Sequence, residues 1–290
     1  MDISDWEIIK VLAKEKNITK TAENLYISQP ALTKRIQQIE SEFGVQLVQR
    51  GRRGVHFTPE GEYMALYAEE MLTRYRQMKD TISNMQKTVT GTLRVGASNY
   101  FTRFKLPRIL KLYKERYPNV EFQVKSGWGS EIYNLVYNQE VHVAFIRGNY
   151  EWNDKKHLIS EENLCVASSI PIHLNDLPRL PRIVYQADNK FRQWVNQWWY
   201  RNYSVPPYIG MEVDKSDTCK EMVLNGLGYA ILARSVLDDS VGLHTIDLTD
   251  QDGVPLKRET WMFYQDDFLK LNVLRTFVEF VESVDFRDLT

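Results

Sequence analysis

The segment from residue 59 to residue 90 constrains the fold more than any other part of the chain. Residues 58–60, Thr-Pro-Glu, provide an N-cap, a proline in the first turn and an early acid, which is the pattern that begins a helix. Residues 62–90 contain no proline or glycine, and four methionines recur every seven residues: Met64, Met71, Met78 and Met85. A helix of this length would extend about 46 Å, too far for a small domain to cover. We therefore predict a linker helix over 59–90 whose apolar stripe packs on a partner helix, with packing against its own chain as the alternative.

This helix divides the 290 residues into a segment before it, 1–58, and a segment after it, 91–290. Lys and Arg number 37 against 38 Asp and Glu, so the net charge indicates no particular partner. The first ten residues are acidic, unlike a signal peptide, and no stretch approaches the ~18 apolar residues of a membrane span. We expect a cytoplasmic protein that does not contact a membrane.

The two cysteines, Cys165 and Cys219, lie 54 positions apart without a histidine or a second cysteine at ligand spacing. This pattern predicts neither a disulfide framework nor a metal site. We expect reduced thiols in the core.

Apolar residues recur at helical spacing in three short runs of residues 1–58. In the third run Ser28 occupies the N-cap position, Pro30 falls in the first turn, and Gly44 is placed to end the helix. The buried positions that we predict are Trp6, Ile8, Ile9 and Leu12, then Ile18, Ala22 and Leu25, then Leu32, Ile36 and Ile39. The other faces of the third helix carry polar groups: Gln29, Thr33, Lys34 and Gln37. They gather near a helix N-terminus, whose dipole attracts phosphate.

A basic hairpin follows the third helix. Residues 45–50 and 55–58 alternate in the manner of strands around the turn sequence GRRG at 51–54. Between Ser28 and Thr58 there are two acids and five bases, a net charge of +3, and the bases are Lys34, Arg35, Arg50, Arg52 and Arg53. Two short helices, a capped third helix and a basic hairpin predict a winged helix-turn-helix that binds DNA.

This region resembles the N-terminal domain of LysR-type transcriptional regulators. The family pattern T-x-A-A-x-x-L-x-x-S-Q-P-A-x-S, then L-E-x-x-L-G, L-F-x-R and T-x-A-G, is matched almost throughout by NITKTAENLYISQPALTKRIQQIESEFGVQLVQRGRRGVHFTPEGE. The departures are mild: Thr21, Thr33, Ile39, Phe43 and Val48 replace Ala, Ser, Leu, Leu and Phe. Thr33 keeps a hydroxyl, so DNA binding is still expected.

The resemblance implies a site on double-stranded operator DNA. Its residues would be Ser28, Gln29, Pro30, Thr33, Lys34, Arg35, Arg50, Arg52 and Arg53. Gln29, Thr33 and Lys34 would approach base edges or phosphates, with Arg52 and Arg53 reaching the flanking minor groove or backbone. For Lys34 and Arg35 the alternative is a solvated helix face. The resemblance also implies that the linker helix pairs two subunits, in a homodimer or a homotetramer.

Residues 91–290 show a different pattern, in which strands alternate with helices. The strand at 91–98 precedes a helix over 106–117, a strand at 120–124, a helix near 130–138 and an apolar strand at 141–147. This order predicts an α/β domain with a mostly parallel sheet. TLRVGAS at the start and NGLGYAIL at 225–232 resemble the two-lobed, periplasmic-binding-protein-like (type II) effector domain of the LysR family, although Ala233 replaces the usual proline. Lobe I would comprise about 91–165 and 265–290, and lobe II about 166–264.

Polar groups at strand ends predict a ligand cleft between the lobes. The expected effector-binding residues are Ser98, Asn99, Tyr100, Gly129, Ser130, Arg147, Thr218 and Arg258. Arg147 ends an apolar strand, where its guanidinium could grip a carboxylate, and Arg258 could supply a second cation. The alternative is that each arginine forms an internal salt bridge. The residues around Arg147, Thr218 and Arg258 resemble the citrate-responsive LysR regulators of Gram-positive bacteria.

Other function classes fit less well. The five histidines are scattered, no HExxH, GxSxG or P-loop motif occurs, and we predict no catalytic residue and no cofactor beyond the effector. A solute-binding protein that does not bind DNA conflicts with the first segment. A redox regulator remains an alternative, because Cys219 near a helix N-terminus could have a lowered pKa. We predict a LysR-type regulator whose operator binding is modulated by a small carboxylate.

Overall fold

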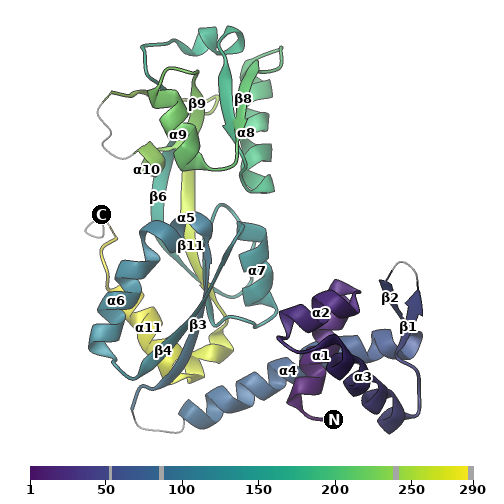
Figure 1. Ribbon diagram of the computed structural model, residues 1–290. Coiled ribbons are helices and arrows are strands. Elements are labelled where there is room, and N and C mark those ends of the chain that lie inside the picture. Colours follow the sequence, from purple (N-terminus) through teal and green to yellow (C-terminus); the bar gives the residue numbers. More distant parts are fainter. Residues whose placement is uncertain (52–53, 85–87, 238–241, 287–290) are drawn as a thin grey trace. The chain divides into compact units, whose positions relative to one another are not determined.

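The computed structural model describes residues 1–51, 54–84, 88–237 and 242–286. The chain forms two compact units, Met1–Gln86 and Lys87–Thr290, each with its own core (Figure 1). Within the described ranges, no helix combines the length and apolar character needed to cross a membrane.

The first unit is a winged helix-turn-helix followed by a long helix. Its elements are α1 (Ile3–Glu15), α2 (Ile18–Asn24), α3 (Gln29–Phe43), β1 (Val48–Gly51), β2 (Gly54–Phe57) and α4 (Pro59–Asn84). Strands β1 and β2 pair antiparallel, as the hairpin pattern predicts. Gly44 ends α3 in the left-handed conformation at φ 67°, and Thr58 caps α4 by accepting a hydrogen bond from the Gly61 amide at 3.1 Å. The three apolar runs meet in one core around Leu12, Leu32 and Ile36.

The linker helix is shorter than the sequence predicts. Helix α4 runs to Asn84, Met85 lies outside the described residues, and residues 88–90 are not helical. The physical reason lies in TVT at 88–90, since β-branched residues favour extended backbone, and Val89 packs against the core of the second unit. Early in α4, Met64 is buried against α1, whereas Met71 and Met78 are 44% and 50% exposed. The stripe therefore packs on its own chain only in its first turns.

The second unit is built on a sheet that continues through both of its lobes. The strand order is β10-β6-β11-β5-β3-β4, with β9 also pairing with β6. The strands are β3 (Gly91–Ser98), β4 (Val120–Gly127), β5 (Val143–Arg147), β6 (Lys155–Ser168), β9 (Ala230–Ala233), β10 (His244–Asp247) and β11 (Lys257–Tyr264). Only β3, β4 and β5 are parallel to one another, while the other pairings are antiparallel. The predicted mostly parallel sheet is thus limited to lobe I, because β6 and β11 pair directly across the two lobes.

Helices cover the sheet on both lobes (Figure 1). Lobe I contains α5 (Asn99–Phe104), α6 (Leu106–Arg116), α7 (Gly129–Tyr137), the 3-10 helix η2 (Asp266–Lys270) and α11 (Asn272–Glu282). Lobe II contains the 3-10 helix η1 (Leu174–Arg179), β7 (Arg182–Tyr185), α8 (Asn189–Asn202), β8 (Ile209–Val213), α9 (Ser216–Leu224) and α10 (Arg234–Leu237). Strands β7 and β8 form a separate parallel pair.

The strands that join the lobes cross at positions different from those expected. Leu164 and Cys165 already belong to the cores of lobe II, whereas Met262 and Tyr264 belong to the core of lobe I. The boundaries between lobes I and II that we expected at residues 165 and 264 were therefore misplaced. The cause is the register, since the last five residues of β11, Thr260–Tyr264, pair with β5 in lobe I.

Candidate functional site

Helix α3 presents a polar face on the first unit. Ser28 accepts a hydrogen bond from the amide of Ala31 at 3.3 Å and caps the helix. Leu32, Ile36 and Ile39 are buried, as the apolar spacing predicts. The residues expected to approach DNA lie on the remaining faces: Gln29, Pro30 and Lys34 are exposed and Thr33 is half-buried. The N-terminal half of α3 therefore has side chains available for base edges and phosphates.

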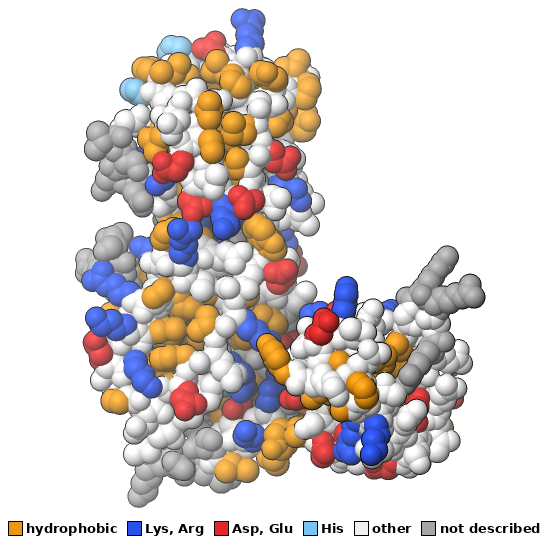
Figure 2. All heavy atoms as spheres, in the orientation of Figure 1, with side chains coloured by type: hydrophobic (Ala, Val, Ile, Leu, Met, Phe, Trp, Pro, Cys, Tyr) orange, Lys and Arg blue, Asp and Glu red, His pale blue; other side chains and the backbone are white. Residues whose placement is uncertain are grey.

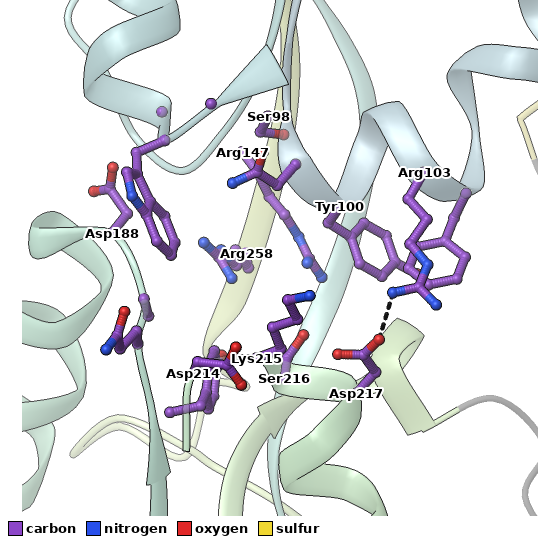
Figure 3. A pocket seen from close by; sticks show the side chains of 18 residues that line it. Ser98, Tyr100, Arg103, Arg147, Asp188, Asp214, Lys215, Ser216, Asp217 and Arg258 are labelled. Atoms are coloured by element: carbon purple, nitrogen blue, oxygen red, sulfur yellow. Dashed lines mark hydrogen bonds and ion pairs between the residues drawn. The ribbon is translucent and has the colours of Figure 1, made fainter. Parts of the chain in front are cut away.

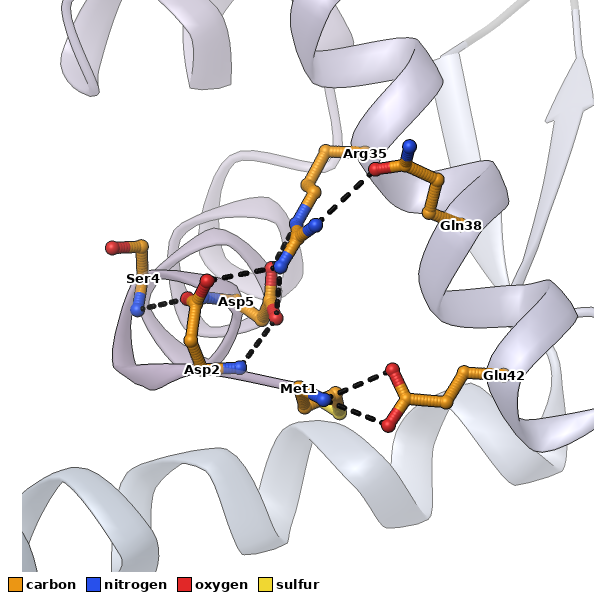
Figure 4. Close-up of polar contacts among 7 residues, drawn as sticks. All are labelled: Met1, Asp2, Ser4, Asp5, Arg35, Gln38 and Glu42. Carbon is orange, nitrogen blue, oxygen red and sulfur yellow. Dashed lines mark hydrogen bonds and ion pairs between the residues drawn. The ribbon is translucent and has the colours of Figure 1, made fainter.

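Arg35 forms hydrogen bonds to acidic residues of its own unit (Figure 4). Its Nε donates to Asp5 Oδ1 at 2.5 Å, and its Nη2 donates to Asp5 Oδ2 at 2.8 Å and to Asp2 Oδ2 at 3.0 Å. Asp5 is buried and also accepts from the Asp2 amide at 2.7 Å, which closes the capping box of α1. Arg35 thus ties α3 to α1, while its place among the DNA-binding residues stays a prediction.

Burial alone would raise the pKa of Asp5. The hydrogen bonds from Arg35 and from the Asp2 amide outweigh burial and hold the pKa of Asp5 below its ordinary value of 3.8. Of the three arginines expected in the wing, Arg50 lies in β1, while Arg52 and Arg53 fall outside the described residues.

A cleft of about 500 Å³ opens between the lobes of the second unit (Figure 3). Six of the eight expected effector residues line this cleft: Ser98, Asn99, Tyr100, Gly129, Arg147 and Arg258. Ser130 and Thr218 do not line it, and their amides donate instead to Asp188 at 3.3 Å and to Asp217 at 3.1 Å. Five of the six meet because β3, β4 and β5 are parallel, so that their carboxyl ends share one edge of the sheet. Arg258 reaches the same edge from the amino end of β11, which is antiparallel to β5.

Arg147 is neutralised by a carboxylate of its own chain. Its Nε donates to Glu162 Oε1 at 2.7 Å, and a terminal nitrogen donates to the same oxygen and, at 2.8 Å, to Ser235 Oγ. The guanidinium also stacks on the Tyr100 ring at 4.1 Å. Burial would raise the pKa of Glu162, but Arg147 and Ser235 keep this pKa below its ordinary value. The salt-bridge alternative therefore describes Arg147 correctly.

Arg258, unlike Arg147, is not paired with a carboxylate of a described residue. It lies on strand β11, between β6 and β5 in the sheet, and its guanidinium stacks on the Phe191 ring at 4.2 Å. Its Nε is buried and has no hydrogen-bond partner, and no ion pair with a described residue neutralises the group. Burial, followed by repulsion from Arg147, lowers the pKa of Arg258 to about 10. Ser98, which lines the same cleft, also has a buried donor, Oγ, without a hydrogen-bond partner. Two residues that line one cavity thus each have an unsatisfied donor, which favours an anion there.

Lobe II contributes cleft residues that the sequence analysis missed. They are Tyr185, Gln186, Ala187, Asp188, Asp214, Lys215, Ser216 and Asp217. Except for Tyr185 and for Ser216 and Asp217 of α9, they follow the carboxyl ends of the parallel strands β7 and β8. The rule that located Ser98 and Gly129 in lobe I would have located them too, had β7 and β8 been recognised as a parallel pair.

The cysteines do not have the environment of a redox sensor. Cys165 and Cys219 are both fully buried, in strand β6 and helix α9. Burial raises the pKa of each thiol to about 12, which contradicts the lowered pKa of Cys219 on which the redox alternative rests. The helix N-terminus is outweighed because the Cys219 sulfur is enclosed by the lobe II core. The redox alternative is not favoured.

Sequence patterns of two protein domains match the chain. The LysR substrate binding domain matches residues 86–285, and the bacterial regulatory helix-turn-helix protein of the lysR family matches residues 3–62. The chain belongs to the LysR family of transcriptional regulators. It therefore combines a DNA-binding domain with an effector-binding domain, and the solute-binding alternative without DNA binding is excluded.

Relatives within the LysR family cover the whole chain. The uncharacterized HTH-type transcriptional regulator YraN of Bacillus subtilis (strain 168) is 39% identical over 283 residues, 98% of each chain. YkuM from the same organism, also an uncharacterized HTH-type transcriptional regulator, is 30% identical over 286 residues, again 98% of each. These relatives are regulators, which confirms that the chain is not an enzyme.

Solved structures of LysR-family proteins share the fold. Full-length AphB of Vibrio cholerae has a TM-score of 0.65 at 16% identity, over 98% of this chain and 100% of that one. Full-length CbnR in complex with its target DNA has a TM-score of 0.64 at 19% identity, over 97% and 99%. The winged helix-turn-helix with a two-lobed α/β effector domain is thus confirmed.

Proposed function

We propose that this LysR-type regulator binds a small carboxylate at Arg258 and Ser98, and that the bound carboxylate modulates its affinity for an operator. The supporting observation is the pair of buried donors without partners, Arg258 Nε and Ser98 Oγ, in a single cleft. A half-buried guanidinium whose enclosed Nε lacks a hydrogen bond is unfavourable in the empty protein, and a carboxylate would provide both charge and hydrogen-bond acceptors. A polycarboxylate such as citrate is the specific candidate, as the sequence around Arg147 and Arg258 suggests.

The DNA-binding half of the proposal rests on α3. Its exposed Gln29 and Lys34 are suited to reading a base edge and attracting a phosphate. CbnR has been solved in complex with its target DNA, which supports the same use of this fold here. Helix α4 would pair two copies through its open stripe, since Met71, Met78 and Ile82 are at least 44% exposed.

Isothermal titration of the full-length protein with citrate and related acids tests the effector site. We expect heat and a raised melting temperature with the wild-type protein, and loss of both with Arg258→Gln. The matched control is Arg234→Gln, because Arg234 is an exposed arginine of lobe II that pairs with Asp247 and does not line the cleft. The proposal is wrong if no carboxylate gives heat, or if both variants bind as the wild type does.

Sedimentation tests the pairing role of α4. Lysine at both Met71 and Met78 would place charge on the open stripe, so we expect dissociation at concentrations where the wild type is a dimer or tetramer. The double variant Glu69→Lys and Arg74→Glu changes exposed charges outside the methionine positions and is expected to leave the assembly intact. An unchanged sedimentation coefficient for the double methionine variant would contradict this role.

A further inference from the structure

The charges of the cleft are arranged so that two cations, not one, lack a partner. Among the basic residues that line the cleft, Arg147 pairs with Glu162, and Arg103 pairs with Asp217 at 2.5 Å. Arg258 and Lys215 form no ion pair with any described residue. Resting on the function proposed above, we propose that the effector is a small dicarboxylate, and that Lys215 of lobe II binds the second carboxylate.

Lys215 is positioned by lobe II alone. It follows β8 and immediately precedes α9, with extended backbone at φ −129° and ψ 150°, and its carbonyl accepts from the Cys219 amide at 3.0 Å. The start of α9 is fixed by Cys219, which is buried in the lobe II core. In Figure 3 the Lys215 and Arg258 side chains both point into the cleft, Lys215 from the residue before α9 and Arg258 from β11.

The acids at the cleft explain why Lys215 would favour a second carboxylate. Asp188 accepts from Tyr150 Oη at 2.9 Å and from the Lys190 amide at 2.9 Å, and Asp217 is paired with Arg103. Asp214 is exposed on the same edge as Lys215. Without the Lys215 ammonium group this edge would repel an anion, because the negative charge of Asp214 would not be offset there. Figure 2 shows acidic and basic side chains gathered where the lobes meet.

A dicarboxylate would therefore connect two parts of the effector domain. One carboxylate would bind Arg258 on strand β11, which pairs with both β5 and β6, and the other would bind Lys215 on lobe II. A monocarboxylate would gain only the first interaction and would leave Lys215 solvated. The ligand would thus favour the conformation in which the two cations are closest, which gives it a differential affinity for the closed cleft.

The experiment compares dicarboxylates of three to six carbons with their half-amides, which keep the length and lose one charge. In calorimetry with the full-length protein, we expect the best dicarboxylate to bind at least tenfold more tightly than its half-amide. Lys215→Gln should reduce that preference to within about twofold and leave the half-amide affinity unchanged. Lys220→Gln is the control and should keep the preference, because Lys220 lies on α9, five positions after Lys215, but outside the cleft lining.

The outcomes separate this inference from the proposed function. Equal binding of dicarboxylate and half-amide, or an equal loss of both in Lys215→Gln, would overturn the role of Lys215 while leaving the carboxylate site at Arg258 intact. If no acid of either series binds, and citrate does not bind either, then the proposed function fails and this inference fails with it.

Discussion

Arg35 in the DNA-binding unit and Arg258 in the effector domain are both arginines near a predicted binding site, yet their surroundings are opposite. Arg35 has a side chain that is 40% exposed, but two carboxylates hold its guanidinium. Arg258 is also half-buried, with its Nε fully enclosed, but no carboxylate of the described residues pairs with it. Exposure is therefore a poor guide to availability. A charged group is available for a ligand when the protein itself leaves its hydrogen bonds unmade.

The largest effect is expected from Arg258→Met. The variant should bind its carboxylate at least about 100-fold more weakly, a loss of roughly 2.7 kcal/mol, because a buried charged partner is removed. In thermal unfolding without ligand it should be as stable as the wild type or more stable, by up to about 2 kcal/mol, since an unpaired buried charge is gone. A strongly destabilised Arg258→Met protein would show that the guanidinium has an internal role like that of Arg35.

Asp5→Ala, in contrast, should destabilise the first unit. It removes the capping box of α1 and leaves Arg35 without its buried partner, so we expect a loss of about 2 kcal/mol in the free energy of unfolding. Asp2→Ala is the comparison variant: it removes the N-cap of α1 and one contact of Arg35 but keeps the pairing of Arg35 with the buried Asp5, so its loss should be smaller. Equal and small losses in both variants would contradict the structural role of Arg35.

The Asp5 carboxylate should make the free energy of unfolding depend on pH. The folded-state pKa of Asp5 is below its ordinary value of 3.8, so its contribution is fully present above pH 4 and is lost as the pH falls through the folded-state pKa. Chemical denaturation between pH 5 and pH 2 should show a shallower loss of stability for Asp5→Ala than for the wild type. Parallel curves would show that Asp5 has the same pKa in the folded and unfolded states.

Two substitutions on α3 distinguish base reading from phosphate attraction. Gln29→Ala should reduce discrimination at one base pair by about 1 to 3 kcal/mol. Lys34→Ala should weaken binding to all sequences and lower the slope of log K against log salt by about one. Binding assays on an operator and its single-base variants, at several salt concentrations, would measure both. If Gln29→Ala leaves footprints and affinity intact, α3 is not the reading helix.

The smallest effect is expected from the cysteines. Because both thiols are buried and their pKa values are raised to about 12, Cys165→Ala and Cys219→Ala should leave effector-dependent DNA binding unchanged, with or without peroxide. The free energy of unfolding should fall only modestly, as expected for a small buried side chain. Loss of the response in either variant would restore the redox alternative.

Much of the fold could be predicted from periodicity and capping residues. The first three helices, the β hairpin and the strands around Ser98 and Arg147 lie where the pattern places them. The partners of Arg35 and Arg147 could not be predicted, because Asp5 and Glu162 are 30 and 15 positions away and nothing local marks them as neighbours. Lys215 was missed for a similar reason, since the pairing of β7 with β8 is long-range. Local sequence specifies elements, whereas charge pairing depends on topology.

The orphaned guanidinium of Arg258 would also link the turnover of the protein to its ligand. A ligand that binds only the folded chain stabilises it, by about 2.7 kcal/mol when its concentration is 100 times the dissociation constant. A protease that cleaves the unfolded chain would then remove the empty regulator faster than the occupied one. If a carboxylate binds at Arg258, its concentration should determine how much of the regulator persists as well as how much of it is occupied.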